Sequence, residues 1–448
     1  MSLASVVIIG AGQAGFQVAA SLRQEGYDGI ITLIGDEPGL PYQRPPLSKA
    51  YLLGKISENA LLFRPADFFV KQRIDLRHDQ ATAIDRQNRR VLLASGEAVA
   101  YDHLVLATGA HNRPLPVPGA ELQGVYGVKT KQDADALAPL AKAASSVVVV
   151  GAGFIGLEFA AVAAELGASV HVLELGDRPM ARAVSTEMSQ LFRQAHESWG
   201  VKFDFRQGLT RIDGKDGKVS GVETSDGRKL PADLVVFGIG VIPNTQLASE
   251  AGLAIENGIR VDANLLTSDP HISALGDVAC FPCLQNGEQP TRLESVQNAA
   301  DQARNVAARL LGKPAPYSAL PWFWTDQGNL KLQIAGLSTG YDSTVTLGSP
   351  ETQQLSVLCF RDDQLVAVES CNRPGDHMAA RKILSRPPQL SAAEAAAEGF
   401  ELKVWEAANR DGTTTAAPTA GRGVNQRHGQ SRFLRPGLSA LPSAQGDT

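Results

Sequence analysis

The chain has 448 residues, enough for two or three domains, and its 44% hydrophobic and 20% charged residues are usual for a globular protein. A net charge of −5 gives no reason to expect nucleic acid as the main partner, and the lack of any apolar run of about 18 residues argues against a membrane-spanning helix. Four cysteines are too few for a disulfide framework and no signal peptide is visible, so a cytoplasmic protein is expected.

The first 110 residues alternate between strand and helix patterns. Residues 6–10 form a short apolar run that ends in glycine, residues 11–25 have helical spacing, and residues 30–35 read as a second strand. Residues 103–109 read as another buried strand. This alternation predicts a parallel sheet with helices on its faces.

The same pattern starts again after a proline-rich stretch at residues 113–118, which suits a crossing between domains. Residues 146–151 predict a strand, 154–166 a helix and 169–174 a second strand, and residues 230–240 close the unit. We therefore expect a second domain of the same kind as the first.

After the second unit, the predicted pattern changes from alternating strands and helices to mostly short strands. Residues 272–277 resemble a strand that ends at a ligand, and a helix is expected near 294–311. Short strands and a last helix are then predicted at 330–336, 355–360, 365–369 and 376–384. These short strands favour a smaller antiparallel domain with one covered face.

Residues 410–448 are rich in Gly, Pro, Ser, Thr and Ala, and their five arginines and two aspartates give about +3. We expect this tail to be disordered, because it cannot bury enough apolar surface to offset its chain entropy. A basic segment that attracts a partner is the alternative.

The first strand-to-helix turn carries the fingerprint Gly10-x-Gly12-x-x-Gly15. Its first glycine allows the tight turn, the second admits a pyrophosphate, and the third lets helix and strand pack closely. Asp36 ends the second strand, 21 residues after Gly15, where it can accept hydrogen bonds from ribose hydroxyls. Strand, helix and acid together predict a dinucleotide site.

A second fingerprint, Gly151-x-Gly153-x-x-Gly156, follows about 140 residues later. Glu174 stands at the end of the next strand, 18 residues after Gly156, and its carboxylate favours NAD over NADP because it repels a 2′-phosphate. Arg178 and Arg182 lie close enough along the chain to weaken that preference. The simplest explanation of two dinucleotides is a bound FAD that relays electrons from NADH.

Four segments occur together in order: GDEPGLPYQRPPLSK at 35–49, VLATG at 105–109, LGD at 275–277 and PWFWTDQ at 321–327. With them the chain resembles, over about residues 5–405, the FAD-dependent ferredoxin reductases of oxygenase systems. The resemblance implies an α/β, glutathione-reductase-like fold of two Rossmann-like domains and a smaller C-terminal α+β domain. It places a split FAD domain at 1–112 and 245–320, an NAD domain at 113–244 and the C-terminal domain at 321–409.

The resemblance also implies which residues contact the two cofactors. Besides the fingerprint glycines, the FAD positions are Ala14, Asp36, Lys49, Ala81, Thr108, Gly109, Lys129, Asp277 and Val296. The NAD positions are Glu158 and Glu174, with Ile155 and Gly240 nearby. Lys129 stands where relatives often have an arginine.

Three of these side chains are expected to act closest to the chemistry. Lys49 can place a positive charge near the edge of a reduced flavin, and Glu158, expected on the first turn of its helix, can pair with Lys49 or meet the nicotinamide amide. Trp322 and Trp324 lie two positions apart on a strand, which we interpret as one core and one surface residue. We favour Trp324 as the one that touches the flavin.

No cysteine lies near residues 38–50, where disulfide reductases of this fold keep their redox-active pair. Cys280 and Cys283 are interpreted as structural or surface thiols, with a regulatory disulfide as the alternative. No metal or catalytic-triad pattern is visible among the eight histidines. Electrons are therefore expected to leave the flavin directly for an external carrier.

The sequence as a whole predicts an NADH-dependent ferredoxin reductase that passes single electrons to a [2Fe–2S] ferredoxin serving a cytochrome P450 or a Rieske-type oxygenase. Rubredoxin, a quinone or monodehydroascorbate as acceptor, and a flavin redox sensor, remain the alternatives. Candidates for a basic docking face are Arg64, Lys71, Arg73 and Arg304. Monomer and homodimer are both open.

Overall fold

The computed structural model describes residues 3–387 and 389–410. Its first sheet is parallel, in the order β20-β7-β1-β2-β3. The strands are β1 (Ser5–Ile9), β2 (Ile30–Gly35), β3 (Ile74–His78), β7 (His103–Leu106) and β20 (Ile272–Ala274). Most of β1, β2, β7 and β20 is buried, as a parallel sheet covered on both faces requires.

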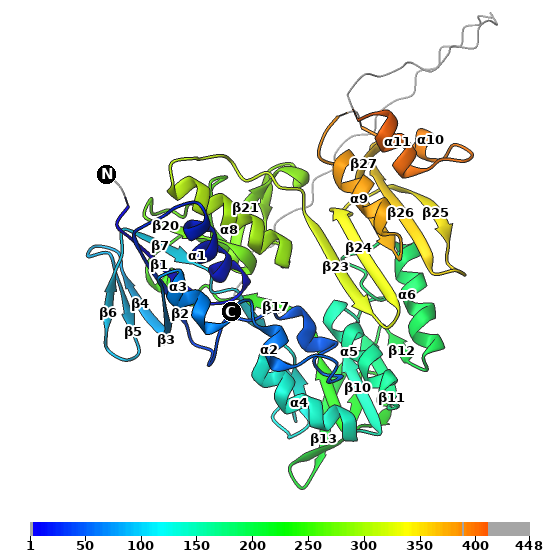
Figure 1. The fold of residues 1–448 in the computed structure, drawn as a ribbon. Helices are drawn as coiled ribbons and strands as arrows, with labels where there is room; N and C mark the ends of the chain where they lie inside the picture. The colour runs from blue at the N-terminus through cyan, green and yellow to red at the C-terminus, as the bar shows by residue number, and fades with distance from the viewer. Residues whose placement is uncertain (1–2, 388, 411–448) are drawn as a thin grey trace, which may run out of the picture. The chain divides into compact units, whose positions relative to one another are not determined.

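Distant parts of the chain assemble this first sheet. Helix α1 (Gln13–Gln24) and helix α8 (Val296–Leu310) pack side by side although they come from opposite thirds of the sequence (Figure 1). Their apolar faces share one core with the sheet. Residues 272–310, which form β20 and α8, therefore complete the domain whose glycine fingerprint lies at residues 10–15.

The second parallel sheet has the order β12-β11-β10-β16-β9. Its strands are β9 (Val125–Gly127), β10 (Ser146–Val150), β11 (Ser169–Glu174), β12 (Lys202–Phe205) and β16 (Leu234–Phe237). The helices of this part are α4 (Lys131–Ala143), α5 (Phe154–Glu165) and α6 (Thr186–Ser198). Strand β8 (Ala110–Asn112) lies where the chain leaves the first sheet, and β17 (Val241–Pro243) lies where it returns. The two strands pair in antiparallel fashion.

Shorter elements, which the sequence patterns did not predict, complete this region. Three antiparallel strands are β4 (Ala81–Asp85), β5 (Arg90–Leu93) and β6 (Ala98–Ala100), and three more are β13 (Leu209–Lys215), β14 (Lys218–Thr224) and β15 (Lys229–Pro231). A mixed sheet contains β18 (Ile255–Glu256), β19 (Gly258–Arg260), β21 (Ala279–Cys283) and β22 (Gln289–Thr291). The short helices are η1 (Pro45–Ser48), α2 (Glu58–Leu61), α3 (Ala66–Lys71), α7 (Gln246–Glu250), η2 (Gly276–Val278) and η3 (Leu284–Asn286).

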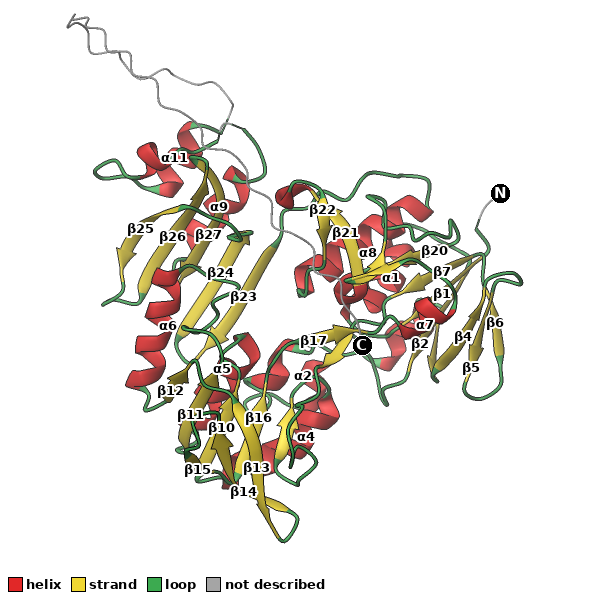
Figure 2. Ribbon diagram, turned by 180° about the vertical axis from the view of Figure 1, so that it is seen from behind, coloured by secondary structure: helices red, strands yellow, loops and turns green. Residues whose placement is uncertain are grey.

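The C-terminal sheet is antiparallel, in the order β23-β24-β27-β26-β25 (Figure 2). Its strands are β23 (Trp322–Gln327), β24 (Leu330–Gly336), β25 (Ser343–Ser349), β26 (Gln354–Arg361) and β27 (Gln364–Cys371). Helices α9 (Pro374–Ile383), α10 (Ala392–Ala395) and α11 (Leu402–Ala408) follow them. The predicted antiparallel α+β character is confirmed.

The expectation of one covered face in this sheet was wrong. Leu358 and Phe360 pack into the core that α9 closes, whereas Leu332 and Val357 face the other way and share a core with Phe192 of α6. Neighbouring residues of β26 therefore point to opposite faces and both are buried. The second face is covered by α6 and the core of the second parallel sheet, which short-range patterns do not reveal.

Within the described residues no helix is long and apolar enough to cross a membrane. The predicted disorder of the tail concerns residues that, apart from Arg410, lie outside the described ranges. The α/β class with a smaller C-terminal α+β part is confirmed, while the residue boundaries of the domains stay a prediction.

Candidate functional site

The first glycine fingerprint adopts the geometry that a dinucleotide requires. Gly10 has φ +104°, and a Cβ there would lie 2.2 Å from the carbonyl oxygen of Ala107. A Cβ at Gly15 would lie 1.9 Å from the Gly10 oxygen, so the close packing of helix and strand depends on glycine. Around Gly12, in contrast, nothing lies within 4 Å of such a Cβ. The open space in front of the α1 N-terminus fits a pyrophosphate.

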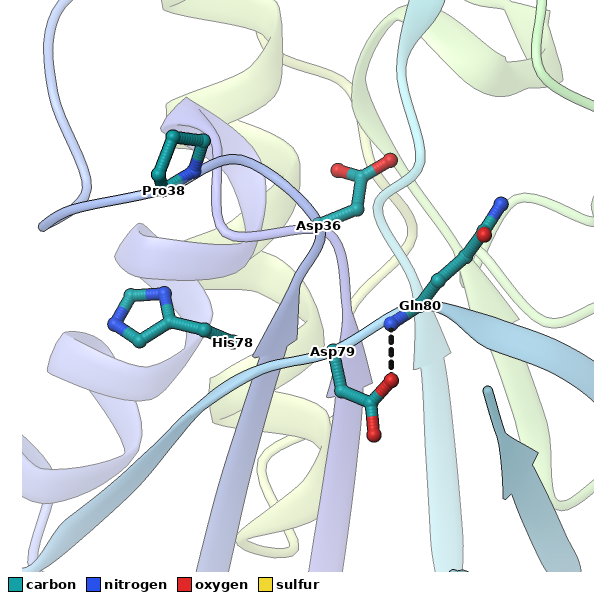
Figure 3. A pocket seen from close by; sticks show the side chains of 5 residues that line it. All are labelled: Asp36, Pro38, His78, Asp79 and Gln80. Atoms are coloured by element: carbon teal, nitrogen blue, oxygen red, sulfur yellow. Dashed lines mark hydrogen bonds between the residues drawn. The ribbon is translucent and has the colours of Figure 1, made fainter. Parts of the chain in front are cut away.

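An open cavity lies past the ends of β2 and β3. It has a volume of about 450 Å³ and is lined by Asp36, Pro38, His78, Asp79 and Gln80 (Figure 3). No side chain or backbone group among the described residues donates a hydrogen bond to the exposed Asp36 carboxylate, whereas Asp79 accepts one from the Gln80 amide at 2.7 Å. Asp36 is therefore available to ribose hydroxyls. Ala81 follows Gln80 as the first residue of β4.

The predicted FAD positions from the far end of the chain gather at the same edge of the sheet. Gly276 has φ +75°, and a Cβ there would lie 3.1 Å from the Ala14 Cβ, which brings the LGD motif against α1. Asp277 follows in η2, and Val296 is the first residue of α8, behind its N-cap Ser295. The Lys129 ammonium lies 3.5 Å from the Asp277 carboxylate, so Lys129 also reaches this edge.

Hydrogen bonds join residues 107–109, which follow β7, to Asn244, which follows β17. The Thr108 hydroxyl donates to the Asn244 carbonyl at 2.9 Å, and the Asn244 side-chain amide donates to the Thr108 carbonyl at 2.7 Å. Gly109 has φ +64°, and no atom lies within 4 Å of a Cβ added there, which leaves open space beside it. These bonds fix where the chain leaves and re-enters the first sheet.

The second fingerprint repeats the geometry of the first. Gly151 has φ +98° and approaches the Gly238 carbonyl, and a Cβ at Gly156 would lie 2.1 Å from the Gly151 oxygen. At Gly153 the nearest atom to an added Cβ is 3.8 Å away, and at Gly240, with φ +99°, none lies within 4 Å. This open cradle fits a second pyrophosphate, and Ile155, 42% exposed on the first turn of α5, lies beside it.

Glu174 is fixed at the edge of this cradle by backbone donors. One carboxylate oxygen accepts from the Ala152 amide at 2.7 Å and the other from the Gly176 amide at 2.6 Å. Arg178 points away, because its guanidinium donates to the carbonyls of Val184 and Ala181. Two arginines were expected to weaken the preference for NAD. Arg178 is held by backbone carbonyls, while Arg182 is exposed.

Lys49 and Glu158 form the ion pair that the sequence suggested. The Lys49 ammonium lies 2.9 Å from Glu158 Oε1, and the two side chains are 17% and 5% exposed. Burial raises the pKa of Glu158, and Lys49 together with hydroxyl donors from Ser48 and Thr325 opposes that rise. The position of Glu158 in its helix was predicted wrongly: α5 begins at Phe154, so Glu158 is in the second turn.

Sequence reasoning missed Ser48 and Thr325 as partners of Glu158. Ser48 ends η1 and Thr325 lies in the middle of β23, so the pair is completed from three distant segments. Ser48 stands next to Lys49 in a motif that was recognised, which was an available signal. No signal in the sequence pointed from Thr325 to α5.

The interpretation of the two tryptophans was wrong in one respect. Residues two apart on a strand point to the same face, and the ring centroids of Trp322 and Trp324 are 5.5 Å apart. Both side chains are half-buried rather than one being core and one surface. Trp322 also contacts His377 and Arg381 of α9, which leaves Trp324 as the freer of the two rings.

The cysteine pair of β21 is buried and unlinked. Cys280 and Cys283 are each 1% exposed and free, and burial raises the pKa of both thiols. Their spacing of three on a strand directs them to opposite faces. Cys280 and Cys283 are therefore buried structural thiols, and the alternative that they are surface thiols was wrong.

Two open glycine cradles, each at the carboxyl edge of a parallel sheet and each followed by an acid, define a two-dinucleotide oxidoreductase. The buried Lys49–Glu158 pair joins the segment that follows η1 to α5, the helix of the second cradle. In the described part of the chain all four cysteines are free, and none lies at residues 38–50.

Comparisons with known proteins agree with this class. The family model described as pyridine nucleotide-disulphide oxidoreductase matches residues 4–303, and the reductase C-terminal model matches residues 322–405. Rhodocoxin reductase of Rhodococcus erythropolis is 50% identical over 408 residues, covering 91% of this chain and 95% of its own. Putidaredoxin reductase CamA of Pseudomonas putida is 41% identical over 390 residues, covering 85% and 92%.

Solved structures give the same result. A ferredoxin reductase from Rhodopseudomonas palustris superposes with a TM-score of 0.88 at 51% identity, covering 90% of this chain and all of the other. The covalent putidaredoxin reductase–putidaredoxin complex gives 0.88 at 38% identity, covering 92% and 100%. The chain belongs to the pyridine nucleotide-disulphide oxidoreductase family and, within it, to the ferredoxin reductases, which use FAD and NAD(P)H.

Proposed function

We propose that this chain is an NADH-dependent ferredoxin reductase that supplies single electrons to a [2Fe–2S] ferredoxin of an oxygenase system. The observation that carries the proposal is the presence of two open cradles and a buried Lys49–Glu158 pair, without a cysteine pair at residues 38–50. When bound, FAD accepts a hydride from NADH and releases electrons singly. The acceptor must then be an external one-electron carrier.

The residues that would hold FAD surround the first cradle. Gly10, Gly12 and Gly15 with the α1 N-terminus bind the pyrophosphate, and Asp36 binds a ribose through its unpaired carboxylate. The positions assigned to the rest of the cofactor are Ala14, Lys49, Ala81, Thr108, Gly109, Lys129, Asp277 and Val296. Lys49 supplies positive charge where negative charge develops, and Glu158 keeps that ammonium in place.

The second cradle would bind NADH during turnover. Gly151, Gly153 and Gly156 receive its pyrophosphate, with Ile155 and Gly240 beside it. Glu174 binds the ribose hydroxyls and disfavours a 2′-phosphate, and the engagement of Arg178 with carbonyls supports the preference for NADH. Trp324, the less enclosed tryptophan of β23, covers the flavin from the C-terminal sheet in this proposal.

The docking face for an acidic ferredoxin includes Arg64 in this proposal. All four basic candidates are exposed. Three are paired with acids, Lys71 with Asp67, Arg73 with Asp28 and Arg304 with Asp301, which reduces the positive charge they present. Among the described residues Arg64 has no such pair, and its guanidinium lies over the Phe68 ring. It is therefore the strongest of the four candidates.

The decisive test is NADH-dependent reduction of a panel of [2Fe–2S] ferredoxins, with rubredoxin, a quinone and monodehydroascorbate in parallel. We expect a ferredoxin to be reduced faster than a free dye such as ferricyanide. Rubredoxin is a serious competitor, because a rubredoxin-NAD(+) reductase of Pseudomonas putida is 40% identical over 371 residues. Failure with every ferredoxin would sink the proposal. Slow turnover with all carriers and a long-lived charge-transfer complex would favour a flavin redox sensor.

We also propose a cytoplasmic location, which the four free, buried thiols support. Size-exclusion chromatography with light scattering would decide between monomer and homodimer.

A further inference from the structure

A row of buried polar side chains leads from Glu158 to helix α6. The Thr325 hydroxyl donates to Glu158 Oε1 at 2.7 Å, and Gln327 Nε2 lies 3.3 Å from Thr325 Oγ1. Gln327 Oε1 in turn lies 2.9 Å from Nε2 of His196. Thr325, Gln327 and His196 are each at most 1% exposed, so bulk solvent does not reach these contacts. The row therefore has to satisfy its own donors and acceptors.

The charge at one end determines the direction of every bond in the row. Lys49 has donors only, so Glu158 Oε1, which also receives Thr325, carries no proton. The Thr325 hydroxyl donates its hydrogen to Glu158, so its oxygen acts as an acceptor towards Gln327. The group of Gln327 that faces it must therefore be the amide nitrogen. The amide oxygen then faces His196, whose Nε2 must carry the hydrogen.

The surroundings of His196 suit a neutral donor. Burial lowers the pKa of His196 to about 4, and its Nδ1 has no hydrogen-bond partner in the structure. Trp199, with a centroid 4.7 Å away, and Phe203, at 6.0 Å, enclose the ring. At neutral pH the imidazole is uncharged, with its hydrogen on Nε2 and its bare Nδ1 among apolar groups.

We propose that His196 is a positioning residue that, through Gln327 and Thr325, keeps Glu158 ionised and Lys49 correctly placed. Each bond in such a row polarises the next, so that a fixed donor at His196 strengthens the Thr325 hydroxyl as a donor to the carboxylate. This inference rests on the proposed function in placing a flavin beside Lys49. It adds a residue of α6 that no contact with either cradle would have indicated.

The protonation of Glu158 depends on every group that faces its carboxylate. Segment 45–49 brings Ser48 and the Lys49 ammonium, and β23 brings Thr325. Lys49 is the charged group among them. Loss of the Thr325 donor, or of the row that supports it, removes stabilisation from the carboxylate and raises the pKa of Glu158 further.

Three variants of the holoenzyme test the row, and a fourth is the matched control. His196→Leu removes the donor at similar volume, His196→Gln keeps a neutral N–H donor, and Thr325→Val removes the hydroxyl. His103→Leu is the control, because His103 is also buried and bonded to a hydroxyl, that of Ser273, at the opposite end of β7 from the first cradle.

Two measurements are made without ferredoxin: the pH titration of the bound flavin's visible absorbance, and the stopped-flow rate of flavin reduction by NADH. We expect Thr325→Val and His196→Leu to shift the titration midpoint to higher pH and to slow reduction about threefold or more, as loss of a hydrogen bond predicts. His196→Gln should recover most of both effects, and His103→Leu should change neither. The double variant that combines His196→Leu with Thr325→Val should resemble Thr325→Val alone.

Unchanged titration and rate in His196→Leu, equal shifts in His103→Leu, or additive effects in the double variant would each overturn the inference. Should a variant fail to retain flavin, ¹⁵N spectra of histidine-labelled wild-type protein, assigned by comparison with His196→Gln, still decide. A neutral Nε2–H tautomer at His196 is expected, and an Nδ1–H tautomer or a charged ring contradicts the row. Failure of the proposed function would look different: these results would hold while no ferredoxin is reduced.

Discussion

At the scale of single residues, the two acids that follow the second strands have different environments. The Asp36 carboxylate has no hydrogen-bond partner among the described residues and borders an open cavity, whereas both oxygens of Glu174 already accept from backbone amides. Glu174 is therefore held rigidly at the rim of its cradle. A fixed carboxylate distinguishes a ribose hydroxyl from a phosphate better than a mobile one, because it cannot move away from the added charge.

Replacing Glu174 tests this role in coenzyme choice. The double change Glu174→Ala and Leu175→Arg removes the negative charge and places a positive one at a residue that is 78% exposed. We expect the ratio of kcat/KM for NADPH to that for NADH to rise at least about tenfold. Glu174→Gln, which keeps an acceptor for one backbone amide, is the control for loop stability. An unchanged ratio would remove Glu174 from the selection of the coenzyme.

At the scale of elements, each strand–turn–helix unit assigns separate tasks to its three glycines. Gly10 and Gly151 have positive φ and face a carbonyl, and Gly15 and Gly156 touch the backbone of the turn. These four are required by the fold itself. A Cβ at Gly12 would meet open space and one at Gly153 only an ordinary contact at 3.8 Å, so these two glycines are required only by what binds there.

Substitution of Gly12 or Gly153 should therefore weaken cofactor binding without lowering the stability of the fold. Gly12→Ala should leave the thermal midpoint of the apoprotein nearly unchanged and weaken FAD affinity about tenfold or more, because the new methyl group occupies the pyrophosphate space. Gly153→Ala should raise the KM for NADH while FAD content stays normal. FAD content, calorimetry and steady-state kinetics provide the comparison. An equally large loss of apoprotein stability in Gly12→Ala and Gly10→Ala would refute it.

At the scale of the whole molecule, buried polar contacts join regions that lie far apart in the chain. Glu158 of α5 meets Lys49 from the N-terminal segment and Thr325 from the C-terminal sheet. Glu369 of β27 accepts from the backbone and hydroxyl of Ser185, the N-cap of α6. Both contacts place a carboxylate at a junction, where its removal acts on more than one region.

The Lys49–Glu158 pair should behave as a coupled unit in stability. Lys49→Met alone leaves a buried, unpaired carboxylate and should destabilise the folded protein by roughly 3 kcal/mol. Lys49→Met combined with Glu158→Gln should recover much of that loss, because no charge then remains buried. Denaturant unfolding of the apoproteins measures the three variants. Additive losses would show that the two side chains are not coupled.

Glu369 predicts a dependence of stability on pH. Burial raises the pKa of Glu369 from 4.5 to about 7. Since the folded state binds this proton more tightly than the unfolded state, the stabilisation is complete below about pH 4.5 and is lost as the pH rises through 7. The loss across this window is up to ~3 kcal/mol.

Glu369→Gln keeps an acceptor for Ser185 but does not titrate. Its stability relative to the wild type should therefore improve between about pH 5 and pH 8, as measured by thermal unfolding at each pH. Ser185→Ala, which removes the hydroxyl but keeps the carboxylate, is the matched control and should retain a pH-dependent term. A constant difference between wild type and Glu369→Gln would contradict the raised pKa.

The sequence alone determined the features that depend on neighbours along the chain. The glycine spacings, the acids that follow the second strands and the strand at 30–35 are local, because turn geometry and strand ends are set within a few residues. The family motifs carried the Lys49–Glu158 pairing as a hypothesis, and the structure brings these two side chains together.

Only the tertiary structure decided the contacts between segments that are far apart in sequence. The second covered face of the C-terminal sheet and the place of Thr325 at Glu158 depend on what packs against β23–β27. The row to His196 likewise needs α6 and β23 in contact. Short-range periodicity reports which residues are buried, but the partner that buries them is fixed by packing across the whole molecule.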